Sequence, residues 1–573
     1  MRFYFIVIIV LLPFLLQANS EKKLIFEING ELKSSKLYDA LGIETRPWYK
    51  FWKDKNPDIN IKIIPTISES LDYFYKSEGF YNSTIKKIET NESVIFKIDE
   101  GLPILIKDIS IHSDENIDKI ITFKKSKRFR TKEFSEIKKE IKNLMLEEGY
   151  CNYQLDAKAR VDIEKDIVSL DYKLKRNNPC YFGKIMVDTP QNIKKKIIFS
   201  RLNFEQGDRY SLKNVNRSYS TISGLEAFDG INIDLDKKED LVDVKIHLKE
   251  KEKKTRIELG VGYETNIGPR GIFRWERRNF AGNARKIAMD FKYSQKEKYA
   301  TNTIYWPAFV KLPFKGHYYL DLKNTLSYSK FEFLNFVERK YSNYLHLLKD
   351  YDVISVDFGV GLERINIEKL KNVDNFQDGD FNLLFPFGKI SLDLRDSKIN
   401  PKNGIYLSQY IETGIDLLKD SSTYLKSITE GRAIYTLGLY TFAAKGKIGL
   451  IQEYANRLPA SKLFFAGGSF SNRGYGYNTL GAFDAKYPQT GGETLIDTTL
   501  EMSHQLYKKF DGALFWDSTL LSKDSHRFSI DFVHSVGIGV RYISPIGPVK
   551  LDLAMDVNNH SQYALHFQIG QSF

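Results

Sequence analysis

The sequence predicts a membrane β-barrel preceded by a series of small α+β domains. Three observations support this fold class. Short motifs repeat in the N-terminal half, the C-terminal half alternates apolar and polar residues, and Phe, Tyr and Trp make up 14% of the chain. Aromatic girdles at the two membrane interfaces account for such a content in an exported barrel. A secreted array of β-sandwiches is the alternative that composition leaves open.

The first 20 residues have the pattern of a secretory signal peptide. Arg2 supplies the positive charge, residues 3–16 are apolar, and Ala18-Asn19-Ser20 form a small-residue cleavage site. The apolar stretch is short for a spanning helix, which needs about 20 residues. No later window is long and apolar enough for one either. We therefore expect cleavage after Ser20 and an exported mature chain.

The net charge and the motifs that the chain lacks limit the classes of function that the sequence allows. The formal net charge is +12, from 85 basic and 73 acidic residues. In an exported protein, anionic lipid headgroups are a more plausible counter-charge than nucleic acid. The chain has no GxSxG, HExxH or phosphate-binding-loop motif, and its nine histidines are scattered. We therefore expect no enzymatic activity, no metal site and no cofactor.

Two recurring motifs divide the N-terminal half into three units of about 75 residues. The motif at 78–82 (EGFYN) returns at 148–152 (EGYCN), and the motif at 115–119 (ENIDK) returns at 191–195 (QNIKK). Small α+β units offer exposed sheet edges to extended peptides, although a plain spacer role is equally compatible. The predicted boundaries are 21–101, 102–179 and 180–253.

Each unit is expected to combine amphipathic helices with alternating strands. Apolar residues three and four positions apart mark one helical face, and apolar residues at every second position, as in 242–248, mark strands. The helical faces comprise Phe134, Ile137, Ile141, Leu144 and Met145 in the second unit and Val215, Tyr219, Ile222 and Leu225 in the third.

The two cysteines are candidates for a disulfide, because an exported protein folds in an oxidising compartment. Cys151 precedes the strand-like segment 153–162, and Cys180 follows the segment 167–174. If these segments form an antiparallel hairpin, the start of the first lies beside the end of the second, where a disulfide fits. Closing a loop of roughly 30 residues would stabilise the domain by about 3 to 4 kcal/mol, whereas two free thiols would add nothing.

The barrel is predicted over residues 254–573, where alternation continues without a long helical window. Strands between lipid and a wet lumen need one apolar face and one polar or small face. The stretch accommodates sixteen strands of about 10 residues, while twelve or fourteen remain arithmetically open. The alternating apolar positions are Ile257, Leu259, Val261 and Tyr263 in the first strand and Tyr563, Leu565, Phe567, Ile569 and Phe573 in the last.

The most specific motif lies within residues 464–481. Arg473-Gly474-Tyr475 forms its centre, with Gly467-Gly468 before it and Gly481 after it. Together with further motifs nearby, it resembles the BamA/TamA superfamily, whose barrels insert and translocate proteins at outer membranes, and three N-terminal units resemble the TamA branch most. The further motifs are Asp396 with Asn400-Pro401 and Gly404, Gly491-Gly492 with Glu501, Phe515-Trp516-Asp517, and 537–542 leading into 544–548.

The resemblance implies sixteen antiparallel strands, three POTRA domains in the periplasm and a barrel in the outer membrane of a Gram-negative cell. It also nominates Glu501 and Asp517 as wall partners of Arg473 in a lumenal latch. A guanidinium offers five donors and keeps its proton, so carboxylates suit it. Gly474 permits a close approach or a positive φ, and Tyr475 adds packing. From the residues alone, Arg473 on a solvent-exposed loop is an equal alternative.

One departure from the family pattern lies beside the latch. Ser518-Thr519 follow Asp517, where the family often has a glycine. The resemblance therefore implies nothing about the local geometry after Asp517.

A lateral gate is expected where the first strand meets the last, because every backbone group must be paired in lipid. Gly260, Gly262 and Gly570 would weaken this seam, since glycine adds no side-chain packing, although lumenal crowding also explains glycines there. A client strand would add to the edge of the first strand. The alternating apolar residues that end at Phe573 resemble the family's C-terminal signal.

The resemblance implies assembly of β-barrel or autotransporter clients without a cofactor. The implied partners are unfolded outer-membrane proteins, outer-membrane lipids and a TamB-like protein anchored in the inner membrane. Two other functions are open: a passive barrel that anchors a phospholipid bridge between membranes, and a secretion pore for one dedicated partner. Such pores usually have two POTRA domains, which disfavours the second.

Overall fold

The computed structural model describes residues 21–46, 52, 54–264, 268–313, 316–333, 335–351, 353–370, 378–417, 423–454, 458–483, 491–507, 509–544 and 547–569. The predicted signal peptide lies outside these ranges. The chain divides into two compact units, Met1–Ile185 with Gln206–Asn214 and Leu235–Val244, and Met186–Glu205 with Val215–Asp234 and Lys245–Phe573. Within the described ranges, every helix is too short or too polar to cross a membrane.

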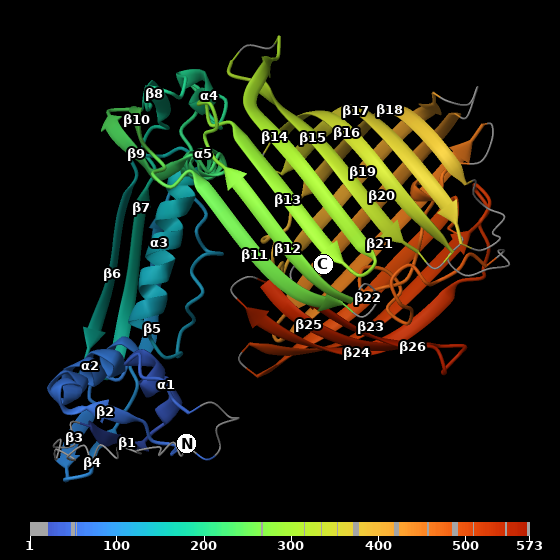
Figure 1. The fold of residues 1–573 in the computed structure, drawn as a ribbon. Coiled ribbons are helices and arrows are strands. Elements are labelled where there is room, and N and C mark those ends of the chain that lie inside the picture. The colour runs from blue at the N-terminus through green and yellow to red at the C-terminus, as the bar shows by residue number, and fades with distance from the viewer. Residues whose placement is uncertain are drawn as a thin grey trace, which may run out of the picture. The chain divides into compact units, whose positions relative to one another are not determined.

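The first small domain packs two helices against a four-stranded sheet (Figure 1). The sheet order is β2-β1-β4-β3, with β1 parallel to β4 and the other neighbours antiparallel. Leu24, Leu71 and Phe96 are fully buried between sheet and helices. Its elements are β1 (Glu21–Asn29), α1 (Ser34–Ala40), β2 (Asp58–Asn60), η1 (Ile61–Ile63), α2 (Ile64–Ser77), β3 (Thr84–Glu89) and β4 (Ser93–Asp99).

The second domain has the same mixed sheet with one strand fewer. β5 (Leu105–Ser113) runs parallel to β7 (Ile167–Lys175), and β6 (Gln154–Asp162) pairs antiparallel with β7. The predicted hairpin is therefore confirmed. Helix α3 (Thr131–Glu147) buries Phe134, Ile137, Ile141 and Met145 against this sheet, as its apolar spacing predicts, while Leu144 is only partly buried.

The third domain has a sheet in the order β8-β10-β9 and shows one error in the predicted helical face. Val215 and Ile222 of α5 are buried, but Tyr219 is 48% exposed and Ser218 takes its place inside. The Ser218 hydroxyl accepts the backbone N–H of Asn203 at 2.8 Å, which satisfies the buried oxygen. The elements are β8 (Tyr181–Asp188), α4 (Lys195–Phe199), α5 (Leu212–Ser223), β9 (Phe228–Lys238) and β10 (Leu241–Glu250).

The remaining strands form one antiparallel sheet of 16 strands in sequence order, which curls into a barrel (Figure 1). The predicted fold class is thereby confirmed. The strands are β11 (Thr255–Glu264), β12 (Gly268–Arg277), β13 (Lys286–Ser294), β14 (Glu297–Lys311), β15 (Tyr319–Glu332), β16 (Phe336–Tyr351), β17 (Ile354–Lys369), β18 (Gly379–Asp393), β19 (Gly404–Asp416), β20 (Thr423–Leu437), β21 (Tyr440–Glu453), β22 (Thr494–Tyr507), β23 (Phe510–Ser522), β24 (Val533–Ser544), β25 (Gly547–Asp556) and β26 (Tyr563–Ile569).

Strand length is uneven, which the even division of the sequence did not predict. Strands β14 to β24 are 12 to 16 residues long. By contrast β11 has 10 residues and β26 only 7. The predicted pairing of first and last strands is not observed, because among the described residues no ladder joins β11 to β26. A seven-residue strand offers few backbone groups for such a ladder.

Strand direction sorts the connections into two ends of the barrel. We call the end at which the chain arrives from the third domain the proximal end, and the opposite one the distal end. Because neighbouring strands alternate in direction, the connection between β21 and β22 lies at the distal end. It spans residues 454–493 and is the longest connection in the sheet. We call it the long loop.

Candidate functional site

The long loop folds back on itself by means of two isolated bridges. Phe464 pairs with Gly492, and Ala466 pairs with Leu480. Between them the chain turns at Gly467, which has a φ of 99° and whose added Cβ would lie 2.5 Å from a backbone oxygen. Only glycine fits such a position without strain. The turn carries Arg473 toward the inner face of the barrel wall.

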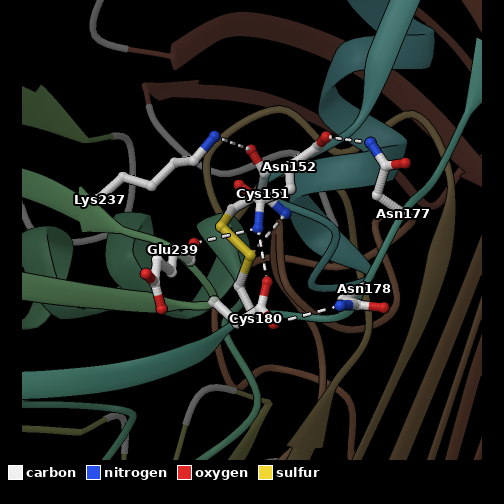
Figure 2. Close-up of a disulfide and its surroundings, with 8 residues drawn as sticks. Cys151, Asn152, Asn177, Asn178, Cys180, Lys237 and Glu239 are labelled. Carbon is white, nitrogen blue, oxygen red and sulfur yellow. Dashed lines mark hydrogen bonds between the residues drawn. A yellow bond between two sulfur atoms is a disulfide. The ribbon is translucent and has the colours of Figure 1, made fainter.

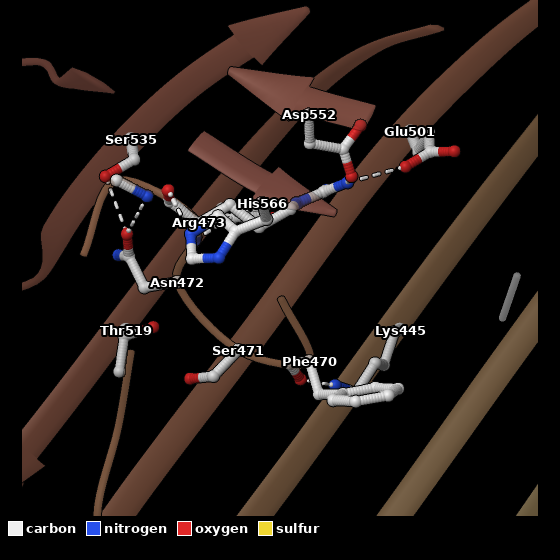
Figure 3. A network of polar contacts seen from close by, with 12 residues as sticks. Lys445, Phe470, Ser471, Asn472, Arg473, Glu501, Thr519, Ser535, Asp552 and His566 are labelled. Atoms are coloured by element: carbon white, nitrogen blue, oxygen red, sulfur yellow. Dashed lines mark hydrogen bonds and ion pairs between the residues drawn. The ribbon is translucent and has the colours of Figure 1, made fainter. Parts of the chain in front are cut away.

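Arg473 is almost completely buried, with 4% of its surface exposed. Its Nε and Nη2 donate to the two carboxylate oxygens of Asp517 at 2.9 Å each, and its backbone N–H donates to the same group at 2.9 Å. Its Nη1 donates to Glu501 at 2.8 Å and lies 3.4 Å from Asp552 (Figure 3). The guanidinium carbon lies 3.3 Å from the centre of the Phe515 ring. The structure thus brings Arg473, Glu501 and Asp517 together.

Sequence reasoning missed two members of this cluster. Arg541 on β24 donates to Glu501 at 3.0 Å and pairs with Asp552 on β25. Two arginines therefore share three carboxylates, and all five side chains are buried. Arg541 lies within the motif at 537–542, and both missed residues occupy inward positions in the alternation of their strands.

The residues that follow Arg473 contact strands near the seam. Gly474 approaches β24 so closely that an added Cβ would lie 2.1 Å from the Ser535 hydroxyl oxygen. Its role is therefore close approach rather than an unusual φ. The Tyr475 hydroxyl donates to Asp556 at 2.6 Å, which fixes the ring to the end of β25.

Residues 472–475, which we call the tip of the long loop, also bind the last strand and the residue before it. The Nε2–H of His566 on β26 donates to the Arg473 carbonyl oxygen at 3.0 Å (Figure 3). The Gln562 side chain donates to the Gly474 carbonyl oxygen at 3.0 Å. Asn472 accepts from Ser535 at 2.6 Å and donates to the Val533 carbonyl oxygen at 3.0 Å. The tip therefore connects β22 and β23 to β24, β25 and β26.

The structure describes most of the residues of β11 and β26 that are predicted to form the seam. Leu259 and Val261 on β11 are 81% and 96% exposed, and Tyr563, Leu565 and Phe567 on β26 also point outward. An added Cβ at Gly260 would meet only Ile272, at 3.6 Å, so lumenal crowding does not explain this glycine. Gly262 pairs with Arg270 on β12. Gly570 and Phe573 lie outside the described residues, as does the side chain of Ile569.

The turn before β19 has the geometry that its motif requires. Both carboxylate oxygens of Asp396 accept backbone N–H groups, from Lys402 at 2.9 Å and from Asn403 at 3.1 Å. Gly404 then has a φ of 123°, a conformation that glycine adopts readily. The Asp396 motif therefore stabilises a proximal turn.

Cys151 and Cys180 form a disulfide with a Cα–Cα distance of 5.7 Å (Figure 2). The bond joins the corner after α3 to the residue before β8, and the Cys180 N–H donates to the Gly149 carbonyl oxygen at 2.7 Å. Asn152 donates to the Glu239 carbonyl oxygen at 3.0 Å (Figure 2).

Comparisons with known proteins agree with this architecture. The Omp85 superfamily domain matches residues 279–573, and the POTRA repeat, described as a surface antigen variable number repeat, matches residues 104–177. The outer membrane protein assembly factor BamA of Neisseria meningitidis serogroup B is 20% identical over 609 aligned positions, covering 91% of this chain and 74% of that protein.

One solved structure extends the comparison to the fold, and a second is reported beside it. BamA from Haemophilus ducreyi lacking POTRA domains 1–3 has 16% identity and a TM-score of 0.54, covering 82% of this chain and 100% of that one. CdiB from Acinetobacter baumannii has 13% identity and a TM-score of 0.46, covering 82% of this chain and 90% of that one.

Proposed function

Because this chain belongs to the Omp85 superfamily, with its barrel in the outer membrane and its POTRA domains in the periplasm, we propose that it inserts other outer-membrane proteins. The clients are β-barrels or autotransporters, and they enter the membrane through a lateral gate between β11 and β26. The process needs neither a cofactor nor chemical energy. The observation that carries this proposal is the attachment of one lumenal loop to both the barrel wall and β26.

The edge of β11 supports the gate. An unpaired strand edge in lipid leaves N–H and C=O groups without partners, and each such group costs several kcal/mol. The edge of β11 must therefore be covered, by β26 or by another strand. A client strand supplies the same backbone hydrogen bonds in any sequence context, which suits a factor that accepts many clients.

The contacts of β26 support a mechanism for opening. His566 and Gln562 bind backbone carbonyl oxygens of the loop tip, so the position of the last strand depends on where the loop lies. While Arg473 remains bound to Asp517, the loop holds β26 against the inner wall. Release of the tip would free β26 to move, so that a client strand rather than β26 could cover the edge of β11.

A disulfide lock across the seam tests the gate. Each variant has one cysteine within residues 257–263 and one within residues 564–569. Assembly of outer-membrane proteins is followed in cells after oxidation of the pair and again after its reduction. We expect a lock to stop assembly and reduction to restore it. A control pair at Ser327 and Ser342, which face each other on β15 and β16, is expected to lock without effect. Normal assembly with a verified seam lock would exclude the gate and favour a phospholipid-bridge anchor or a dedicated pore.

We also propose a TamB-like partner anchored in the inner membrane, on the basis of the three POTRA domains. The first domain is the one farthest from the barrel in sequence, so we expect it to meet this partner. A photo-crosslinking amino acid at the exposed Tyr73 of α2 should capture an inner-membrane-anchored chain. Capture of outer-membrane clients alone, with no such chain, would contradict this part of the proposal.

A further inference from the structure

The long loop has a second buried cation that the Arg473 cluster does not contact. Lys462 lies in the short helix η2 (Ala460–Lys462), eleven residues before Arg473, and is only 5% exposed. Its Nζ lies 3.0 Å from Glu363 on β17 and 3.2 Å from Glu412 on β19. These strands belong to a different part of the wall from β22 to β26.

The two carboxylates are held in place by the wall itself. The Tyr344 hydroxyl donates to one oxygen of Glu363, which leaves the other oxygen for Lys462. Tyr410 and Tyr424 donate to the two oxygens of Glu412, the second at 3.1 Å. Because these tyrosines lie on strands, the acidic site is formed independently of the loop.

Aromatic rings and a second lysine complete the site. The Lys462 Nζ lies 3.7 Å from the centre of the Phe385 ring and 5.7 Å from that of Tyr424. Ammonium groups are attracted to aromatic faces, most strongly where water is excluded. Lys426 on β20 donates to the Lys462 carbonyl oxygen at 2.7 Å, so the backbone of η2 is fixed as well.

We propose that Lys462 is a second anchor of the long loop, so that the loop is a strap fastened to two separate parts of the barrel wall. Lys462 fastens residues 458–466, the first arm of the loop, to strands β17–β20. Arg473 fastens the tip to strands β22–β26. Release of Arg473 alone then frees β26 while the first arm stays bound. The loop remains in the lumen during opening and returns to the same place afterwards.

The charges favour this return. When Lys462 leaves, Glu363 and Glu412 keep their tyrosine partners, and Lys340 stays 4.0 Å from Glu363. Glu412 loses the ion pair that Lys462 supplied, which is unfavourable for a carboxylate inside the barrel, so the empty site attracts the ammonium group again. The anchor is a property of the barrel, while its part in client insertion rests on the proposed function.

A single reporter cysteine tests the anchor in the full chain. Both native cysteines are bonded to each other, so an Ala460→Cys variant has one free thiol, in a fully buried position beside Lys462. Labelling of this thiol by a membrane-impermeant maleimide is measured on cells. We expect Lys462→Gln to raise the labelling rate at least tenfold and Lys462→Arg to raise it less than threefold. Arg473→Gln alone is expected to raise it less than threefold.

The control is Lys296→Gln, which removes an exposed lysine from another distal connection and should leave labelling unchanged. Equal labelling in Lys462→Gln and its parent would overturn the anchor, as would a tenfold rise from Arg473→Gln alone. Heat-dependent gel mobility verifies that each barrel is folded. If Lys462→Gln does not fold, Glu363→Gln with Glu412→Gln decides: a folded barrel labelled at least tenfold faster supports the anchor, and a folded barrel that stays protected overturns it.

Client assembly is followed in the same cells, which separates the two proposals. A rise in labelling together with normal assembly supports the anchor and counts against the strap having a part in insertion. A seam lock that leaves assembly intact removes the gate but does not change the labelling result.

Discussion

Arg473→Ala is expected to detach the tip of the long loop and to abolish most client assembly. The substitution leaves Asp517, which is fully buried, without its bidentate partner, and it leaves Glu501 and Asp552 with Arg541. Removing one member of a buried ion pair typically costs about 3 to 5 kcal/mol. We expect a lower unfolding temperature of the purified barrel and a loss of assembly in cells.

Two comparisons make this prediction specific. Arg339→Ala removes an arginine on β16 that is 39% exposed and pairs with Glu368, so it should change stability by less than about 1 kcal/mol. Arg473→Lys keeps the charge but loses the planar fork, so an intermediate loss is expected. A barrel that tolerates Arg473→Ala as well as Arg339→Ala would show that the cluster does not hold the loop.

The fold was largely predictable because its signals are local. Alternation of apolar and polar residues along one strand needs no knowledge of the neighbouring strands, and the repeats at 78–82 and 148–152 mark equivalent corners. Strand length was not predictable in the same way. Alternation continues beyond the membrane, so β16 extends to 16 residues without any change in pattern.

Helical faces show a related limit. Ser218 and Tyr219 are adjacent, and either position could join the face of Val215 and Ile222. The choice depends on a hydrogen bond between Ser218 and Asn203, a residue that precedes the helix. Apolar spacing therefore favoured Tyr219, whereas the tertiary contact selected Ser218.

The site was predictable only where a motif pointed to it. Arg473, Glu501 and Asp517 lie in short motifs that resemble a known family. Arg541 lies in the motif at 537–542, but nothing in the sequence marked it or Asp552 as a partner of the latch. In the register of β24 and β25, Arg541 lies opposite Lys550 and Asp552 lies opposite Gly539, so the two side chains meet diagonally across one strand pair.

No motif in the sequence pointed to a role for Lys462. Lysine in a loop is usually solvated, and its partners Glu363 and Glu412 are 99 and 50 residues away along the chain. Only the curvature of the barrel and the path of the loop bring the three together.

Gly474→Ala is expected to move the loop tip away from β24 and to reduce assembly strongly. The added Cβ would lie 2.1 Å from the Ser535 hydroxyl oxygen and 2.8 Å from its Cβ, both closer than real contacts allow. Relief requires a shift of the tip, which carries the carbonyl oxygen that accepts from Gln562. Overpacking of this kind typically costs about 1 to 3 kcal/mol. Maleimide labelling of a single cysteine engineered near the tip measures the movement of the loop. Assembly of clients in cells measures the effect on function.

A compensating substitution distinguishes steric displacement from a general loss of stability. Ser535→Gly removes both atoms of the clash and leaves the Asp556 backbone nitrogen, at 3.3 Å, as the next obstacle. The double variant should therefore recover part of the assembly, although it loses the hydrogen bond from Ser535 to Asn472. Gly446→Ala on β21, where an added Cβ meets no atom within 4 Å, should have no effect. If Ser535→Gly restores nothing, the close approach of Gly474 to β24 is not what positions the tip. If it restores assembly, that contact holds the loop tip in the place from which it binds β26.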